Sequence, residues 1–172
     1  MSIEISNRVW TRSVSEKTAR LVMLVLADFA DQIAAAGVKR INVSLDTLRA
    51  DRFTAMTRRD ELAHVLDGID AAIDAGFDPV KVNAVVQRGI NDDEIVDLAT
   101  FGRERGVEVR FIEFMPLDAQ ATWDLSQVVG QDEIVAKIAE VYPLEQVPAR
   151  GAAPADRWRY LDGKGTIGVI PS

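Results

Sequence analysis

The chain of 172 residues contains no cysteine. Disulfides, cysteine-ligated zinc, a thiol nucleophile and iron–sulfur clusters held by cysteine are therefore excluded for this chain. Its single histidine, His64, lies in the helical pattern DELAHVLDGIDAAIDAG, which predicts a helix-surface position. One histidine supports neither a histidine metal site nor a Ser-His-Asp triad. We therefore assign no metal-binding and no catalytic residue.

Long hydrophobic runs are also missing. The most apolar window, 21–30, is interrupted by Asp28 and is much shorter than the run of about 18 residues that a membrane-spanning helix needs. No secretory signal is visible at the N-terminus. Hydrophobic residues nevertheless make up 48% of the chain, as expected for a folded domain. The sequence predicts a cytoplasmic protein without a membrane partner.

Basic residues are the minority among the charged ones. The chain has 20 basic and 27 acidic residues and a net charge of −7. A general nucleic-acid-binding protein normally displays a basic face, so nucleic acid is not expected as a partner. A small basic pocket for a nucleotide remains compatible with this charge. Residues 1–25 differ from the rest, with four basic and two acidic side chains.

Apolar patterning predicts a regular alternation of strands and helices up to residue 116. Glycines close most of the expected helices, and the loops are a few residues long. Such an alternation indicates βαβ units, a parallel sheet and right-handed crossovers. We expect strands at 38–45, 80–86 and 107–115, and helices at 15–36, 49–56, 60–75 and 92–105. Three parallel strands form only part of a barrel, whose edges remain open to self-association.

The pattern changes after Pro116. An irregular stretch, 117–129, precedes a helix expected at 130–142 and an edge strand at 143–147. Two short β-rich runs, 157–161 and 166–170, flank the sequence Asp-Gly-Lys-Gly and predict a C-terminal β-hairpin. The glycine-lysine-glycine sequence is a turn, because a phosphate-binding loop needs a longer glycine-framed span.

Polar side chains inside the expected strands are the candidate site residues. Ligands of α/β folds gather at the carboxyl ends of the strands, and unpartnered polar groups are costly to bury. Two interpretations remain open from the residues alone. Lys81 or Arg110 pairs with Glu113 in an internal network, or Lys81 and Arg110 form a cationic pocket for phosphates. Met115 at the end of the third strand is interpreted as core packing.

Three segments carry a family resemblance. They are KRINVSLDTLRADRF at 39–53, VKVNAVVQRGINDDEI at 80–95 and VRFIEFMPL at 109–117. In this order and spacing they resemble the GTP 3′,8-cyclases of molybdenum cofactor biosynthesis, a radical SAM family. The resemblance implies a partial, incomplete TIM-type βα barrel with parallel strands. It also implies S-adenosylmethionine and 4Fe-4S clusters as cofactors, and GTP as the substrate converted to a cyclic dihydro-GTP intermediate.

The resemblance also assigns roles to individual residues. Ser44 and Met115 stand where the family contacts S-adenosylmethionine, and Lys81 stands where it contacts GTP. Arg110 lies in a family motif and is expected to line the same GTP cavity. The family's cysteine-containing segments are absent, so we expect no cluster in this chain and no activity of the chain alone.

The first residues do not share the resemblance. We divide the chain into an unrelated N-terminal helical segment, 1–25, and a partial radical SAM barrel fragment, 26–172. The N-terminal segment, including Trp10, has a faint likeness to the opening helices of helix-turn-helix proteins. A DNA-binding or interaction module without catalysis is therefore the alternative function.

Overall fold

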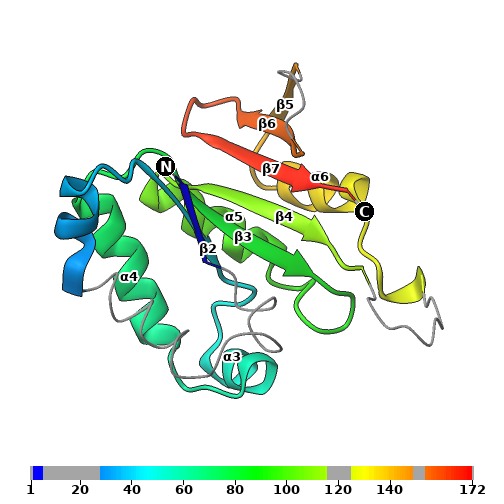
Figure 1. Ribbon diagram of the computed structural model, residues 1–172. Helices are drawn as coiled ribbons and strands as arrows, with labels where there is room; N and C mark the ends of the chain where they lie inside the picture. Colours follow the sequence, from blue (N-terminus) through cyan, green and yellow to red (C-terminus); the bar gives the residue numbers. More distant parts are fainter. Residues whose placement is uncertain (1, 6–27, 116–124, 149–153, 172) are drawn as a thin grey trace. The chain divides into compact units, whose positions relative to one another are not determined.

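The computed structural model describes residues 2–5, 28–115, 125–148 and 154–171 (Figure 1). The chain divides into two compact units, Met1–Val82 and Asn83–Ser172. The predicted helix at 15–36 lies partly outside the described residues, and its described part is helical over 28–35. Trp10 and the rest of the helix-turn-helix-like segment beyond residue 5 also lie outside them.

The first unit is built on strands in the order β1-β2-β3. The strand β1 (Ser2–Ile5) pairs in parallel with β2 (Arg40–Ser44). The start of β3 (Val80–Val86) joins β2: the backbone N–H of Asp78 donates to the carbonyl of Lys39, at 2.9 Å. Its described helices are 28–35, α3 (Ala50–Thr57) and α4 (Leu62–Asp74).

Hydrophobic periodicity explains these elements. In β2 the buried Ile41 and Val43 alternate with partly exposed neighbours, which is the period-two pattern of a strand with one covered face. In α4 the buried side chains recur at spacings of three and four residues and form one apolar stripe. They are Leu62, Val65, Ile69 and Ala72.

The second unit holds the rest of β3 and four further strands, in the order β3-β4-β7-β6-β5. The strand β4 (Glu108–Glu113) pairs in parallel with β7 (Thr166–Ile170). The antiparallel strands β6 (Asp156–Tyr160) and β5 (Leu144–Val147) extend the sheet to its edge. The described helical elements are α5 (Ile95–Arg105), the 3-10 turn η1 (Leu125–Gln127) and α6 (Gln131–Ala139).

One face of the β4-β7-β6 strands is apolar. It carries Val109, Ile167 and Trp158, which stand opposite one another in register and are buried. The helix α5 packs closely here, because Gly102 has no side chain: a Cβ atom at this position would lie 2.4 Å from Cγ2 of Val109. The core of the second unit therefore lies on this face. The opposite face is left for polar groups.

The mixed α/β architecture predicted from the sequence is confirmed. The bounds of β3 agree with the expected strand, and the C-terminal hairpin forms as β6 and β7. Two features were not expected. The four-residue strand β1 precedes β2, and β7 lies parallel to β4 while closing the hairpin with β6. Neither pairing is visible in local patterning, because each partner is distant in the sequence.

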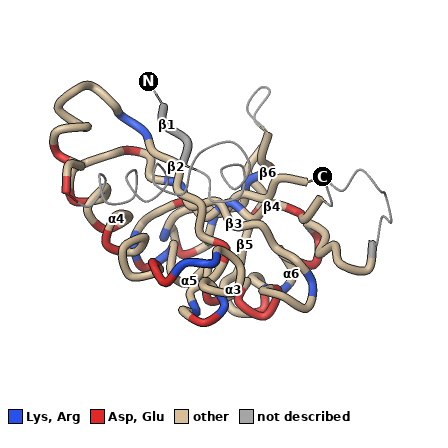
Figure 2. Tube along the Cα trace, turned by 60° about the horizontal axis from the view of Figure 1, so that its bottom comes forward, with Lys and Arg blue, Asp and Glu red and all other residues tan. Residues whose placement is uncertain are grey.

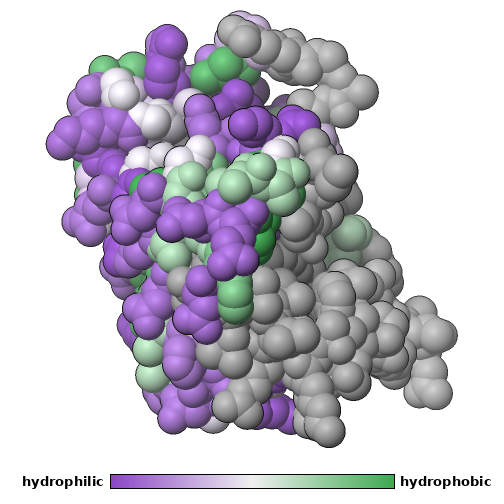
Figure 3. Space-filling view, turned by 60° about the vertical axis from the view of Figure 1, so that its left-hand side comes forward, coloured by the Kyte–Doolittle hydropathy of each residue, from purple (hydrophilic) through white to green (hydrophobic). Residues whose placement is uncertain are grey.

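Surface features agree with a polar exterior. His64 lies on α4 with 51% of its side chain exposed and contacts the carboxylate of Glu61 at 2.8 Å, as its helix-surface prediction requires. Charged residues follow the dipole of α6, with Asp132 and Glu133 in its first turn and Lys137 in its last (Figure 2). The face drawn in Figure 3 is largely hydrophilic over its described residues. In the described part of the chain, no helix is both long and apolar enough to cross a membrane.

Candidate functional site

Ser44 and Lys81 are the candidate site residues of the first unit. Ser44 is the last residue of β2, and Lys81 is the second residue of β3. Both are partly exposed, whereas their neighbours Val43 and Val82 are buried. Successive side chains of a strand point to opposite faces, so Ser44 and Lys81 lie on the faces of their strands away from these valines. The predicted polar face is thus present in this unit.

Arg110 is the candidate cation of the second unit, and its partner differs from the expected one. Its Nε donates a hydrogen bond to Oε1 of Glu108 at 2.9 Å. Of the two interpretations left open by the sequence, the internal ion-pair network is thus present at Arg110, but with Glu108 in place of Glu113. The period of the strand explains the difference, because Glu108 lies two residues away on the same face and Glu113 projects from the other.

Glu113 instead stabilises a helix. Its Oε1 accepts a hydrogen bond from the backbone N–H of Gln131 at 2.7 Å, at the first residue of α6. A carboxylate at this end complements the helix dipole and satisfies an N–H group that has no partner within the helix. Glu113 is therefore a structural residue.

Met115 lies two residues beyond β4 and is 48% exposed. The interpretation of Met115 as core packing is wrong, since nearly half of the side chain is accessible. A thioether at the end of a strand is available for contact with a ligand.

The sequence missed the residues around Glu108. This carboxylate is buried, with 8% exposed, and its Oε2 also contacts strands β6 and β7. It accepts from Nη2 of Arg157 in β6 at 2.5 Å and from the hydroxyl of Thr166 in β7 at 3.0 Å. The signal for Arg157 was present in the sequence DRWRY, where charged and aromatic residues alternate. Such alternation predicts one charged strand face, but the acidic partner comes from a strand 49 residues away.

Asn83 in β3 carries an unusual buried group. The residue is 9% exposed, and its Oδ1 has no hydrogen-bond partner among the residues that the structure describes. A buried amide oxygen without a partner costs about 1–3 kcal/mol. Such a group suits a donor supplied by a ligand, and it belongs to one of the strands singled out from the sequence.

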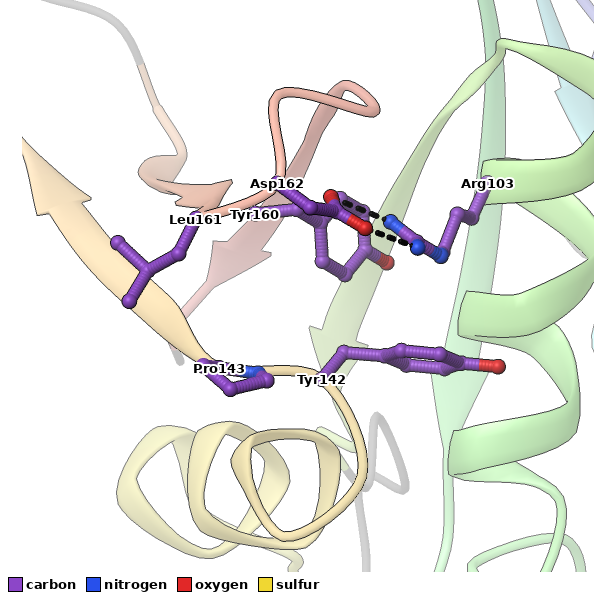
Figure 4. A pocket seen from close by; sticks show the side chains of 6 residues that line it. All are labelled: Arg103, Tyr142, Pro143, Tyr160, Leu161 and Asp162. Carbon is purple, nitrogen blue, oxygen red and sulfur yellow. Dashed lines mark hydrogen bonds and ion pairs between the residues drawn. The ribbon is translucent and has the colours of Figure 1, made fainter.

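A separate cavity of about 320 Å³ lies at the hairpin end of the second unit (Figure 4). The guanidinium of Arg103 lies 4.8 Å from the ring centre of Tyr142 and 5.2 Å from that of Tyr160. Both of its terminal nitrogens donate to the carboxylate of Asp162 in the β6–β7 turn. Cation–π contacts and a two-pronged ion pair therefore join α5 to the hairpin.

The same contacts shift two ionisation equilibria. Hydrogen bonds from the Arg103 guanidinium lower the pKa of Asp162 from 3.8 to about 2. Burial raises the pKa of Tyr160 from 10.0 to about 12. Both shifts favour a charged carboxylate and a neutral phenol at neutral pH. The ion pair of Arg103 with Asp162, formed by the charged carboxylate, attaches the hairpin to α5.

The described residues do not provide a set of metal-ligating side chains. Among the described residues, no group of three or more histidine or acidic side chains is placed to hold a metal ion. The whole chain lacks the thiolates that hold an iron–sulfur cluster, so the residues present do not fit such a cofactor.

Comparison with solved structures gives the fold. The structure titled "Structure of TYW1 with a lysine-pyruvate adduct bound" aligns with a TM-score of 0.50 and 15% identity. The alignment covers 71% of this chain and 41% of that chain. At this identity the likeness concerns the arrangement of helices and strands alone.

Curated relatives are much closer in sequence. The GTP 3′,8-cyclase of Pelotomaculum thermopropionicum is 46% identical over 153 residues, which are 87% of this chain and 46% of the relative. The Streptomyces coelicolor enzyme of the same name is 47% identical over 83% of this chain and 42% of its own length. The Geobacter sulfurreducens enzyme is 47% identical over 86% of this chain and 45% of its own length. The chain thus spans less than half the length of these relatives.

Two family models divide the chain between them. Residues 107–172 match the family described as Molybdenum Cofactor Synthesis C. Residues 15–102 match the Radical SAM superfamily, and this match begins within the segment 1–25 that the sequence analysis set apart. The radical SAM match covers more than half of the 172 residues, and the chain therefore belongs to the radical SAM superfamily.

Proposed function

We propose that this chain supplies part of the ligand-binding cavity of a GTP 3′,8-cyclase of molybdenum cofactor biosynthesis, and that it binds GTP and S-adenosylmethionine. The observation that carries the proposal is the 46% identity to a curated cyclase across 87% of the chain. The match of residues 107–172 to Molybdenum Cofactor Synthesis C supports the same assignment. We also propose a cytoplasmic location, where a nucleotide substrate is available.

The fold within this proposal is a partial TIM-type barrel. Parallel pairing of β1 with β2 and of β4 with β7 supports it, as do the partly exposed polar side chains on β2 and β3 in the first unit and on β4 in the second. In barrels of this type the inward face and the carboxyl ends of the strands carry the ligand site. The division into residues 1–25 and 26–172 remains part of this proposal.

Four side chains contact the two ligands in this proposal. The ammonium of Lys81 and the guanidinium of Arg110 neutralise the phosphates of GTP. Ser44 and Met115 contact S-adenosylmethionine through a hydroxyl and a thioether. The unpartnered oxygen of Asn83 is an acceptor that suits a donor group of either ligand.

The chain alone binds without catalysing. Radical formation from S-adenosylmethionine requires an iron–sulfur cluster, and the chain has no cysteine to hold one. Its residues therefore position ligands, and the cyclisation itself needs cluster-bearing segments that this sequence does not contain.

Isothermal titration of the purified chain with GTP tests the proposal. Lys81→Ala is expected to weaken GTP binding about tenfold, since a hydrogen bond to a charged group contributes about 1.5–3 kcal/mol. Lys39→Ala is the matched control, because Lys39 is exposed just before β2 and carries the same charge. Equal affinities of the two variants, or no GTP binding by the unaltered chain, would contradict the proposal.

A further inference from the structure

Three neighbouring strands of the second unit place two arginines in one row. Arg110 of β4 stands opposite Gly168 of β7, and Arg157 of β6 stands opposite the same glycine. Directly opposed residues project from the same face of a sheet. With strands spaced about 4.8 Å apart, the backbones of Arg110 and Arg157 are about 10 Å apart across the central strand.

Gly168 leaves the space between the two arginines without a side chain. A Cβ atom at this position would lie 3.3 Å from Cγ of Arg110 and 3.4 Å from Cβ of Ala155. Any larger residue would therefore press against the stem of Arg110 and fill the gap in the row. The face in question is the one opposite the buried Ile167.

Glu108 fixes both arginines at this gap. One carboxylate oxygen accepts from Nε of Arg110 and the other from Nη2 of Arg157. Thr166 completes the cluster, since its hydroxyl donates to Glu108 and accepts from Arg157 at 3.0 Å. A buried carboxylate that binds two guanidinium groups holds both in one geometry. Long charged side chains on an open surface remain mobile by comparison.

The cluster retains hydrogen-bond donors and positive charge. Two guanidinium groups and one carboxylate leave a net charge of +1. A guanidinium has five N–H donors. Among the described residues, Arg110 uses only Nε, and the buried Nε of Arg157 has no partner. Arg157 is also 42% exposed, so part of its guanidinium faces solvent.

We propose that Arg157 is a second phosphate-contacting residue, which acts with Arg110 across the gap at Gly168 and is held in place by Glu108. A planar guanidinium binds phosphate oxygens in pairs, and two of them on one rigid sheet suit a chain of phosphates. The inference rests on the proposed function, in which these phosphates belong to GTP. It adds a residue from the C-terminal hairpin to the site.

The test is isothermal titration of the full chain with three probes: tripolyphosphate, GTP and guanosine. Arg157→Gln is expected to weaken tripolyphosphate and GTP binding about tenfold and to leave guanosine binding unchanged. Arg159→Gln is the matched control, because Arg159 lies on the same strand face and carries the same charge, but pairs with Glu145. Its affinities are expected to stay within about twofold of those of the unaltered chain.

A second variant guards against misfolding. Arg157→Lys keeps the charge but loses the planar fork, so it is expected to bind tripolyphosphate more tightly than Arg157→Gln and less tightly than the unaltered chain. Thermal unfolding of each variant is recorded alongside. If Arg157→Gln does not fold, the tripolyphosphate affinity of Arg157→Lys tests the inference instead. An affinity below those of the unaltered chain and of Arg159→Gln supports it, and an equal affinity overturns it.

The outcomes separate this inference from the proposed function. Normal GTP binding by both Arg157 variants would overturn the inference and leave the proposed function intact. Tripolyphosphate binding that depends on Arg157, without any binding of GTP and without an effect of Lys81→Ala, would support the inference and overturn the proposed function. No binding of tripolyphosphate or GTP by the unaltered chain would overturn both.

Discussion

Asp162 illustrates how a single charge in a surface turn ties distant elements together. Its carboxylate accepts from both terminal nitrogens of Arg103 and from the backbone N–H of Lys164. Arg103 in turn lies against the rings of two tyrosines. One carboxylate thus organises its own turn and links it to α5, 59 residues earlier in the chain.

Asp162→Asn is expected to lower the free energy of unfolding at neutral pH, because it replaces the charged acceptor of Arg103. The pKa of Asp162 falls from 3.8 to about 2 on folding, so its charge stabilises the folded chain fully above pH 4. This contribution is lost as the pH falls from about 4 towards about 2. Urea unfolding of both proteins between pH 7 and pH 3 is the measurement.

The difference between the two proteins is therefore largest near pH 7 and shrinks below about pH 4. Asp67→Asn is the control, since Asp67 is exposed on α4 and forms no ion pair among the described residues. If the difference in the free energy of unfolding between the unaltered chain and Asp162→Asn stays constant down to pH 3, the charge of Asp162 does not stabilise the folded chain.

At the level of elements, the packing of α5 on β4 depends on one glycine. Gly102 is buried within α5, and a Cβ atom there would lie 2.4 Å from Cγ2 of Val109 and 3.0 Å from the carbonyl oxygen of Val107. Glycine inside a helix is normally less favourable than alanine by about 1 kcal/mol. At position 102 glycine is favoured over alanine instead, because helix and strand approach too closely for a Cβ atom.

Gly102→Ala is accordingly expected to lower the free energy of unfolding by about 1–3 kcal/mol, the usual cost of overpacking a core. Glu104→Ala, an exposed substitution two residues later on the same helix, is expected to change it by less than about 0.5 kcal/mol. Chemical denaturation of the three proteins measures both values. A stabilised Gly102→Ala protein would mean that α5 does not pack on β4 at this distance.

Local signals predicted the elements well and their pairing poorly. The valines of VKVNAVV give β3 its bounds, and the glycine after Arg105 ends α5. The sequence SIEI was too short to stand out as a strand, although it pairs with β2. The partner of Arg110 was misassigned for a different reason: residues 108 and 110 share a strand face and residue 113 does not, but this period was not applied to Glu108.

The residues of the candidate site were also only partly predictable from local sequence patterns. Their positions inside predicted strands singled out Lys81 and Arg110, whereas Ser44 became a candidate through the family resemblance. Sequence patterning did not identify Arg157 and Gly168, because their position opposite Arg110 depends on the register of β4, β7 and β6. Register is set by non-local pairing and by the covered apolar face, and no single segment contains that information.

At the level of the whole molecule, composition limits chemistry more strictly than fold does. The chain belongs to a superfamily named for S-adenosylmethionine radical chemistry, yet it contains no cysteine and one histidine. Open strands at the sheet edges remain a predicted route to self-association. Iron–sulfur ligation depends on thiolates, which no backbone arrangement replaces.

Incubated anaerobically with ferrous iron, sulfide and a reductant and then desalted, the chain is expected to retain neither iron nor sulfide. No cysteine is available to ligate a cluster, and a lone histidine on α4 cannot substitute for the missing thiolates. The GTP 3′,8-cyclase of Geobacter sulfurreducens, treated in parallel, is the positive control for the reconstitution. Iron and sulfide analysis with visible absorption is the measurement, and GTP turnover of the same samples is expected to be absent for this chain. Stoichiometric iron and sulfide that survive desalting would require ligands other than cysteine, and cyclised GTP would contradict the assignment of the chain to binding alone.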